Sequence, residues 1–217
     1  MYIAPPDATL GEAEWRPFVE ANSFGHLVAS GRDRDVAVVV PTQFRLVGDT
    51  VSLHLVRTNP LFGALAENPH VVLSVAGDWA YIPSDWKAID GEDPALGIPT
   101  TYYAAVQLTG TATVHDERTT PSSVAAVLRH QLAGLQPDTA IADPAVAHPR
   151  ELQSILGISI AVDSVAAKFK YGGSADEAHR LTVVDHLRTR QGPGDEAAAG
   201  HVLRRLAARD PSGRARQ

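Results

Sequence analysis

The chain contains no cysteine, and this absence excludes several classes of site at once. There can be no disulfide scaffold, no cysteine-ligated zinc finger, no iron–sulfur cluster and no thiolate nucleophile. Long apolar runs are also missing, because the longest candidate, Val36 to Val40, stops at Pro41 and a bilayer span needs roughly 18 residues. The first residues lack both a basic and an apolar segment, so we expect no signal peptide, no membrane association and a cytoplasmic location.

Positive charge is scarce as well. Lys and Arg total 19 against 25 Asp and Glu, which gives a net charge of −6. Because an acidic protein repels a phosphate backbone on average, direct DNA binding is disfavoured. The only basic concentration is the C-terminal tail from Arg204 to Arg216, a pattern typical of a solvated helix face. No GxGxxG, Walker, HExxH or GxSxG motif is present, so the common nucleotide, zinc-protease and hydrolase sites are not indicated.

Hydrophobic periodicity predicts that the middle of the chain is mostly strand. Predicted strands cover residues 25–30, 35–46, 51–56, 71–75 and 100–114, and a last strand or strand pair covers 157–171. Pro41 has no N–H for a ladder and indicates an edge strand or a bulge, while Gly110 indicates a bend or bulge. The run Val47-Gly48-Asp49-Thr50 predicts the tight turn of an antiparallel hairpin.

Helices are predicted around this sheet. They cover residues 10–21, 59–66, 119–131, 176–190 and 195–209, and Trp15, Phe18 and Val19 form the inner stripe of the first. Strands in hairpin order without regular βαβ alternation favour an antiparallel barrel with helices packed on its outside. The expected fold class is mainly β with flanking helices. We expect a β-barrel domain over residues 1–171 and a C-terminal helical extension of the same domain over 172–217, joined at Gly172-Gly173-Ser174.

The run His54-Leu55-Val56-Arg57-Thr58-Asn59-Pro60 leads a strand directly into a helix. The first turn of a helix carries unsatisfied N–H groups and partial positive charge, which favour an anion. Arg57 could clamp a phosphate or carboxylate with two hydrogen bonds. Alternatively, Asn59 only caps the helix and Arg57 is a surface charge. His54 alternates with Leu53 and Leu55, so its side chain points to the face opposite the expected core.

Three weaker candidates lie further along the chain. Trp86 and Lys87 could form a stacking face for a planar anionic cofactor, or the tryptophan could simply close the mouth of the barrel. Thr100 and Thr101 offer hydroxyls at the start of a strand, a position where ordinary β-propensity is an equally simple explanation. Lys168 alternates with aromatic residues and with a second lysine two positions on, so both ammonium groups project to one face of a strand.

Six runs, taken in order, resemble the PaiB-like family of FMN-binding negative transcriptional regulators. They are MYIAPP, SFGHLVAS, HLVRTNPLFGAL, GDWAYIPSDWKA, GIPTTYYAAVQLTG and GISIAVDSVAAKFKYG, and together they span roughly residues 1–171. The resemblance implies an FMN-binding split β-barrel of the flavin reductase and pyridoxamine-phosphate oxidase type. It also implies a homodimer with the flavin at the subunit interface.

The resemblance also implies a set of cofactor-binding residues. The family's RxNP segment falls on Arg57, Asn59 and Pro60 as the phosphate seat, and its strand histidine falls on His54. The full set is His54, Arg57, Thr58, Asn59, Trp86, Lys87, Thr100, Thr101 and Lys168. The family's Trp-Asn after Pro-Thr is replaced here by Thr101-Tyr102, and its Ser-Gln after KFK by Gly172-Gly173.

Three functions remain open on the sequence. The first is an FMN-binding protein that regulates through flavin or redox chemistry. The second is a heme-dependent biosynthetic enzyme of the same fold, comparable to the enzyme that closes piperazate by forming an N–N bond. There His54 would be the axial ligand of the iron, as one neutral imidazole nitrogen can be. The third is a cofactor-free interaction module. The sequence assigns no catalytic residue.

Overall fold

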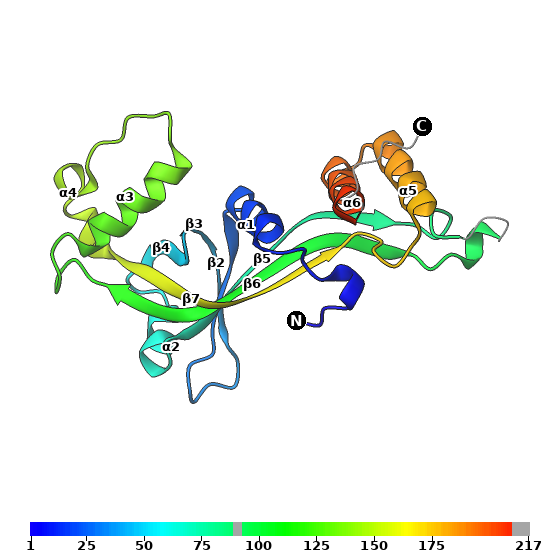
Figure 1. The fold of residues 1–217 in the computed structure, drawn as a ribbon. Helices are drawn as coiled ribbons and strands as arrows, with labels where there is room; N and C mark the ends of the chain where they lie inside the picture. The colour runs from blue at the N-terminus through cyan, green and yellow to red at the C-terminus, as the bar shows by residue number, and fades with distance from the viewer. Residues whose placement is uncertain (89–92, 210–217) are drawn as a thin grey trace. The chain divides into compact units, whose positions relative to one another are not determined.

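The computed structural model describes residues 1–88 and 93–209, and the strands of this part form one sheet (Figure 1). The sheet has seven strands in the order β2-β1-β5-β6-β7-β4-β3. Their bounds are β1 Phe24–Ala29, β2 Val38–Gln43, β3 Arg45–Val47, β4 Thr50–Val56, β5 His70–Ile82, β6 Thr100–His115 and β7 Ile155–Lys170. Strand β1 pairs antiparallel with β2 and β5, and β4 pairs antiparallel with β3 and β7. The predicted mainly β class with flanking helices is confirmed.

The helices are α1 Glu12–Ala21, α2 Leu61–Glu67, α3 Ser123–Leu135, α4 Pro144–Ala147, α5 Glu177–Arg190 and α6 Asp195–Arg209. Short 3₁₀ turns cover Pro5–Asp7, Pro94–Leu96 and Glu151–Ser154. The inner stripe predicted for the first helix is confirmed, since Trp15, Phe18 and Val19 are all buried. Within the described residues no helix combines the length and apolarity that crossing a membrane requires.

Strand β2 forms an edge of the sheet and contains Pro41, as its missing N–H predicts. The tight turn is also confirmed, because Val47 pairs with Thr50 across the β3–β4 hairpin. Gly110 has a different role from the predicted bend. Strand β6 runs through it without interruption, and a Cβ atom there would lie 2.1 Å from the carbonyl oxygen of Ala161. Close approach of two backbones therefore requires the glycine.

The chain divides into two compact units. The first unit comprises residues 1–14, 76–105 and 167–217, and the second comprises residues 15–75 and 106–166. The buried core of the second unit includes Phe18, Val19, Leu27, Leu53 and Ile158. The core of the first unit includes Ile82, Ala104, Phe169, Val183 and Val202.

In the first unit, α5 and α6 lie side by side (Figure 1). Buried polar side chains attach α6 to the other segments of this unit. His201 Nε2 lies 2.7 Å from Asp78 Oδ2, and the imidazole stacks on the Tyr171 ring with centroids 4.5 Å apart. Arg205 forms two hydrogen bonds to the Glu14 carboxylate, at 2.6 and 2.9 Å, and two more to the carbonyls of Pro6 and Ala8. The N-terminal segment is therefore fixed to the last described helix.

Candidate functional site

The predicted site residues fall into two groups, one in each unit. His54, Arg57, Thr58 and Asn59 lie in the second unit. Trp86, Lys87, Thr100, Thr101 and Lys168 lie in the first unit.

A cavity of about 310 Å³ lies in the first unit, and we call it the lysine pocket. It is lined by Ala4, Pro6, Asp7, Lys87, Ile98, Thr100, Tyr102, Lys170, Gly172, Gly173 and Ser174. Segments that are distant in the sequence meet there, namely the N-terminus, the loop after β5, the start of β6 and the end of β7. Four of the six runs that carry the family resemblance supply these segments.

Two lysines and one aspartate, Asp7, line the pocket and give it a net positive charge. Lys170 Nζ donates a 2.6 Å hydrogen bond to Thr100 Oγ1, and Lys87 Nζ lies 3.4 Å from His179 Nε2. Burial, and then the nearby charge of Lys170, lower the pKa of Lys87. Burial, and then the charge of Lys87, likewise lower the pKa of His179. Because like charges are held close together with little water, an anion entering the pocket would stabilise them.

Tyr102 adds a buried donor to the same pocket. Its side chain is 1% exposed, and its hydroxyl has no hydrogen-bond partner among the described residues. Burial raises the pKa of Tyr102 to about 12, so the phenol stays protonated at neutral pH. A buried hydroxyl without a partner costs about 1–3 kcal/mol, and a ligand oxygen at this position would recover that cost.

Gly172 and Gly173 form part of the pocket wall. The sequence predicted them only as the joint between the barrel and its C-terminal helical extension. A Cβ atom at Gly172 would lie 2.2 Å from the Tyr102 hydroxyl oxygen, and one at Gly173 would lie 2.3 Å from the Pro6 carbonyl oxygen. A side chain at either position would therefore collide with Tyr102 or with the Pro6 backbone, so close packing of the wall requires glycine here. These are the two positions where the family pattern has Ser-Gln.

Lys168 lies beside the lysine pocket without lining it. Its ammonium donates to the Tyr2 carbonyl at 3.3 Å and lies 3.9 Å from Asp7 Oδ2. The ammonium groups of Lys168 and Lys170 lie 5.5 and 6.0 Å from the centroid of the same Tyr103 ring, so the predicted shared face is confirmed. Thr101 alternates with Thr100 along β6 and is absent from the pocket lining.

Trp86 faces a different cavity of about 570 Å³, lined by residues of its own loop and of α5. Its indole stacks on His186 with ring centroids 4.9 Å apart, and the Arg190 guanidinium lies 4.6 Å from the ring centroid. The stacking partners of this tryptophan are therefore side chains of α5. Of the five predicted residues in the first unit, the structure brings together Lys87 and Thr100 in one pocket.

In the second unit, His54 is held in a defined tautomer. Its Nδ1 lies 2.8 Å from Gln131 Oε1, and Gln131 Nε2 donates a 3.1 Å hydrogen bond to the Gln43 carbonyl. A carbonyl can only accept, which fixes the orientation of the Gln131 amide, and Nδ1 of His54 must therefore carry the proton. The lone pair remains on Nε2, which is the state of a metal-ligating imidazole.

Arg57 forms a paired contact inside the second unit. Its guanidinium donates to both carboxylate oxygens of Asp116, at 2.5 and 2.7 Å, and to the Gln153 carbonyl at 2.9 Å. Hydrogen bonds from Arg57 lower the pKa of Asp116 to about 2. The donors that a phosphate clamp would use are thus engaged by a carboxylate of the same chain.

Asn59 acts as a local cap. Its Oδ1 accepts the Leu61 N–H at 2.9 Å, and α2 begins at Leu61, so Pro60 precedes the helix and is not its first residue. Thr58 is exposed at the same junction. The alternative interpretation is that Asn59 only caps the helix and that Arg57 is a surface charge. Asn59 does accept an N–H of α2, whereas Arg57 is 22% exposed and paired with Asp116. The helix has only seven residues, which limits the field at its N-terminus.

Comparison with known proteins identifies the family. Residues 1–164 match the family described as "Putative FMN-binding domain". The chain belongs to this family. It is also 24% identical over 197 residues to "Protease synthase and sporulation protein PAI 2" of Bacillus subtilis (strain 168), a match that covers 88% of this chain and 90% of that protein. The predicted PaiB-like membership is confirmed.

Solved structures of similar fold include a flavocytochrome and an FAD and heme binding protein. The flavocytochrome Anf3 from Azotobacter vinelandii has a TM-score of 0.58 at 21% identity, over 80% of this chain and 74% of that one. The FAD and heme binding protein from Mycobacterium smegmatis has a TM-score of 0.58 at 18% identity, over 81% and 78% of the two chains. At these identities the likeness shows the fold, which is the split barrel that the family resemblance predicts.

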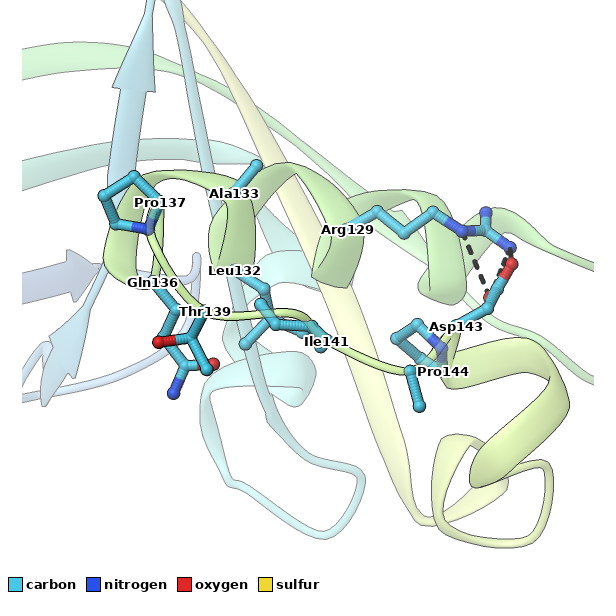
Figure 2. A pocket seen from close by; sticks show the side chains of 10 residues that line it. Arg129, Leu132, Ala133, Gln136, Pro137, Thr139, Ile141, Asp143 and Pro144 are labelled. Atoms are coloured by element: carbon cyan, nitrogen blue, oxygen red, sulfur yellow. Dashed lines mark hydrogen bonds and ion pairs between the residues drawn. The ribbon is translucent and has the colours of Figure 1, made fainter.

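A further cavity of this PaiB-like chain lies in the second unit along α3, with a volume of about 400 Å³ (Figure 2). Leu132 and Ile141 contribute apolar surface, and Arg129 forms an ion pair with Asp143 at 2.8 Å (Figure 2). Its charged side chains are already paired, and none of the predicted site residues lines it. We therefore place the candidate ligand site of the described residues at the lysine pocket, in the first unit.

The predicted site residues omit Tyr102 and the N-terminal run, both of which line the pocket. Tyr102 is noted as the replacement of a family asparagine but is left out of the predicted set, although it shares a face of β6 with Thr100 because the two are two positions apart. The residues of the N-terminal run MYIAPP were not assigned to a site, although this run was part of the resemblance. No cluster of three or more His, Asp or Glu that could hold a metal ion occurs in residues 1–88 and 93–209.

Proposed function

We propose that this chain binds FMN and that the lysine pocket holds the phosphate of the cofactor. The observation behind the proposal is that Lys87, Lys170 and Tyr102 line one cavity, and that the buried Tyr102 hydroxyl has no partner among the described residues. A phosphate offers acceptors to all three, and charge-assisted hydrogen bonds are the strong ones. The match to a family described by FMN binding supports the choice of flavin. When bound, the flavin would supply the redox chemistry.

We also propose that the protein is a homodimer and that any regulatory effect runs through flavin chemistry or a protein partner. The net charge of −6 argues against operator binding by the protein's general electrostatic field.

Titration of FMN and of riboflavin, followed by flavin fluorescence, tests the phosphate assignment. Lys170→Met removes a charge-assisted contact worth about 1.5–3 kcal/mol, so FMN should bind roughly 10- to 150-fold more weakly. Riboflavin, which lacks the phosphate, should bind as in the wild type. Lys168→Met is the matched control, because Lys168 lies beside the pocket without lining it, and its effect on FMN should be smaller.

Two outcomes would contradict the assignment. If Lys170→Met weakens both ligands equally, the lysine acts through folding or through the ring. If only Arg57→Ala weakens FMN selectively, the phosphate lies at the junction of β4 and α2. In that case Asp116→Asn, which releases the Arg57 guanidinium, should strengthen FMN binding.

Heme is a second candidate cofactor, and the tautomer of His54 favours it. The Nδ1–H of His54 donates to Gln131, which leaves Nε2 free to act as an axial ligand of iron. Absorbance spectra after separate reconstitution with FMN and with hemin distinguish the candidates. A Soret band that His54→Ala removes would support heme, flavin bands alone would support FMN, and neither would leave the cofactor-free interaction module.

A further inference from the structure

The side chain of Lys87 starts from a fixed piece of backbone. The Lys87 N–H donates to the Ser84 carbonyl at 2.8 Å, which closes a turn after β5. Gly97 packs against the same turn so closely that a Cβ atom there would lie 1.9 Å from the Ser84 carbonyl oxygen. Lys87, which lines the lysine pocket, thus starts from a turn that packing holds in place.

Groups from every surrounding element determine whether Lys87 carries its proton. Lys170 faces it from β7, and His179 faces it from α5, where Asp176 lies near the imidazole. Tyr102 of β6 and Asp7 of the first 3₁₀ turn line the same cavity. Burial and the charge of Lys170 lower the pKa of Lys87. An amine attacks carbonyls only in its neutral form, and a desolvated lysine beside another cation reaches that form at lower pH.

The two other lysines of this region lack such an environment. Lys170 donates to a hydroxyl at 2.6 Å, and Lys168 donates to a backbone carbonyl and lies 3.9 Å from a carboxylate. Both of these ammonium groups therefore have oxygen acceptors. The nitrogen 3.4 Å from Lys87 belongs to an imidazole, which can remain uncharged and can accept a proton.

We infer that Lys87 is a nucleophilic amine that condenses in the lysine pocket with an aldehyde that also carries a carboxylate or phosphate. The Nζ lone pair forms a bond to the carbonyl carbon as the C=O π bond breaks, and the carbonyl oxygen takes up the proton that the nitrogen loses, which gives a carbinolamine. Loss of water then gives the imine, so one amine and one aldehyde yield one imine and one water with no change in oxidation state. The ammonium of Lys170 and the hydroxyl of Tyr102 are placed to hold the anionic end.

This inference rests on the lysine pocket as a ligand site and does not depend on the identity of the cofactor. It adds a covalent ligand class to the pocket for which we propose a phosphate seat. The two proposals use overlapping residues, so a bound FMN phosphate and a bound anionic aldehyde should compete.

The test labels the flavin-free full-length protein with 4-carboxybenzaldehyde. The imine is trapped with borohydride, and mass spectrometry of peptides measures the modified fraction at each lysine. At pH 7, Lys87 should be modified faster than Lys168, since a lowered pKa raises the fraction of Lys87 that is neutral and can react. Benzaldehyde, which lacks the carboxylate, should react at Lys87 more slowly than 4-carboxybenzaldehyde.

Variants separate nucleophilicity from binding. With benzaldehyde, Lys170→Met should slow the modification of Lys87 at pH 7, because removal of the like charge returns the pKa of Lys87 toward its ordinary value. Lys168→Met is the matched control and should leave the rate at Lys87 unchanged. In Lys170→Met the rate at Lys87 should level off at a higher pH than in the wild type.

Equal modification of Lys87 and Lys168 at every pH would overturn the inference. Protection of Lys87 by added FMN would support both proposals. Rapid labelling of Lys87 that FMN does not prevent would support the inference and contradict the phosphate assignment. Because the labelling is measured without flavin, failure of the flavin proposal leaves this test decisive.

Discussion

Because of the ion pair between Arg57 and Asp116, the free energy of unfolding of the second unit should depend on pH in the acidic range. A carboxyl whose pKa is lowered by folding stabilises the folded state above its unfolded-state pKa and loses that contribution as the pH falls. Arg57 lowers the pKa of Asp116 to about 2, so the contribution should be complete above about pH 4 and lost toward pH 2. The side chains are 22% and 25% exposed, and solvent screening limits the effect of the pair to about 1 kcal/mol.

Asp116→Asn should therefore lower the free energy of unfolding by about 1 kcal/mol at pH 6, and the difference from wild type should shrink at pH 2.5. Urea unfolding at the two pH values measures it. Asp143→Asn is the matched control, because Asp143 also pairs with an arginine but both partners are more than two-fifths exposed. A pH-independent loss for Asp116→Asn would mean that the side chain acts through shape and not through charge.

The partner of Arg57 in this ion pair could not be predicted from the sequence around Arg57. The segment from His54 to Pro60 has the residue types of an anion seat, but the partner that engages Arg57 lies 59 positions away. No local pattern links the two, because the pairing depends on the ends of β4 and β6. His54 is similar, since its tautomer depends on Gln131 of α3. By contrast, the shared face of Lys168 and Lys170 follows from strand alternation and was predictable.

At the scale of elements, α6 holds the N-terminal segment through a buried arginine. Arg205 is 3% exposed and makes its hydrogen bonds to Glu14, Pro6 and Ala8. Removal of one partner from such a pair leaves a buried charge uncompensated, which costs about 3–5 kcal/mol. Arg205→Met should therefore destabilise the protein by about 3 kcal/mol. It should also increase amide exchange in residues 2–9, which include part of the lysine pocket wall.

Urea unfolding and peptide-level hydrogen exchange measure the two effects. Arg204→Met is the matched control, since Arg204 is the adjacent residue of the same helix and is exposed. It should change stability by less than about 0.5 kcal/mol. If both variants behave alike, the anchoring of the N-terminal segment does not depend on Arg205.

Helix ends were predictable where the capping group is local. The Asp176 side chain accepts the His179 N–H at 2.8 Å, and the predicted span 176–190 agrees with α5 to one residue. The predicted helix 119–131 instead begins at Ser123. There Ser122 adopts a left-handed φ of 65°, and the Glu117 carboxylate accepts the N–H groups of Ser122 and Val124. Hydrophobic periodicity does not reveal a cap that comes from a residue outside the helix. The predicted start of this helix therefore lies four residues before the observed one.

At the scale of the whole molecule, the exposed aromatic residues of β5 bear on assembly. Trp79 is 59% exposed and Tyr81 is 50% exposed on one face of the strand, in a chain with few aromatic residues. Large apolar side chains that are exposed next to one another often mark a surface that binds a partner. The occupant we propose is a second copy of this chain, as the family resemblance implies.

Light scattering of the purified protein at micromolar concentration should therefore report a mass close to twice 23.1 kDa. Tyr81→Glu should shift the mass toward the monomer, because it places a charge where the dimer excludes water, while the circular dichroism spectrum stays unchanged. Leu181→Glu is the matched control, since Leu181 is also a large apolar residue, 40% exposed, and belongs to α5. A wild-type mass of 23.1 kDa would contradict the dimer, and an unchanged mass for Tyr81→Glu would place the interface elsewhere. The dimer and the phosphate seat are tested separately, because the flavin titration reports Lys170 whatever the mass of the assembly.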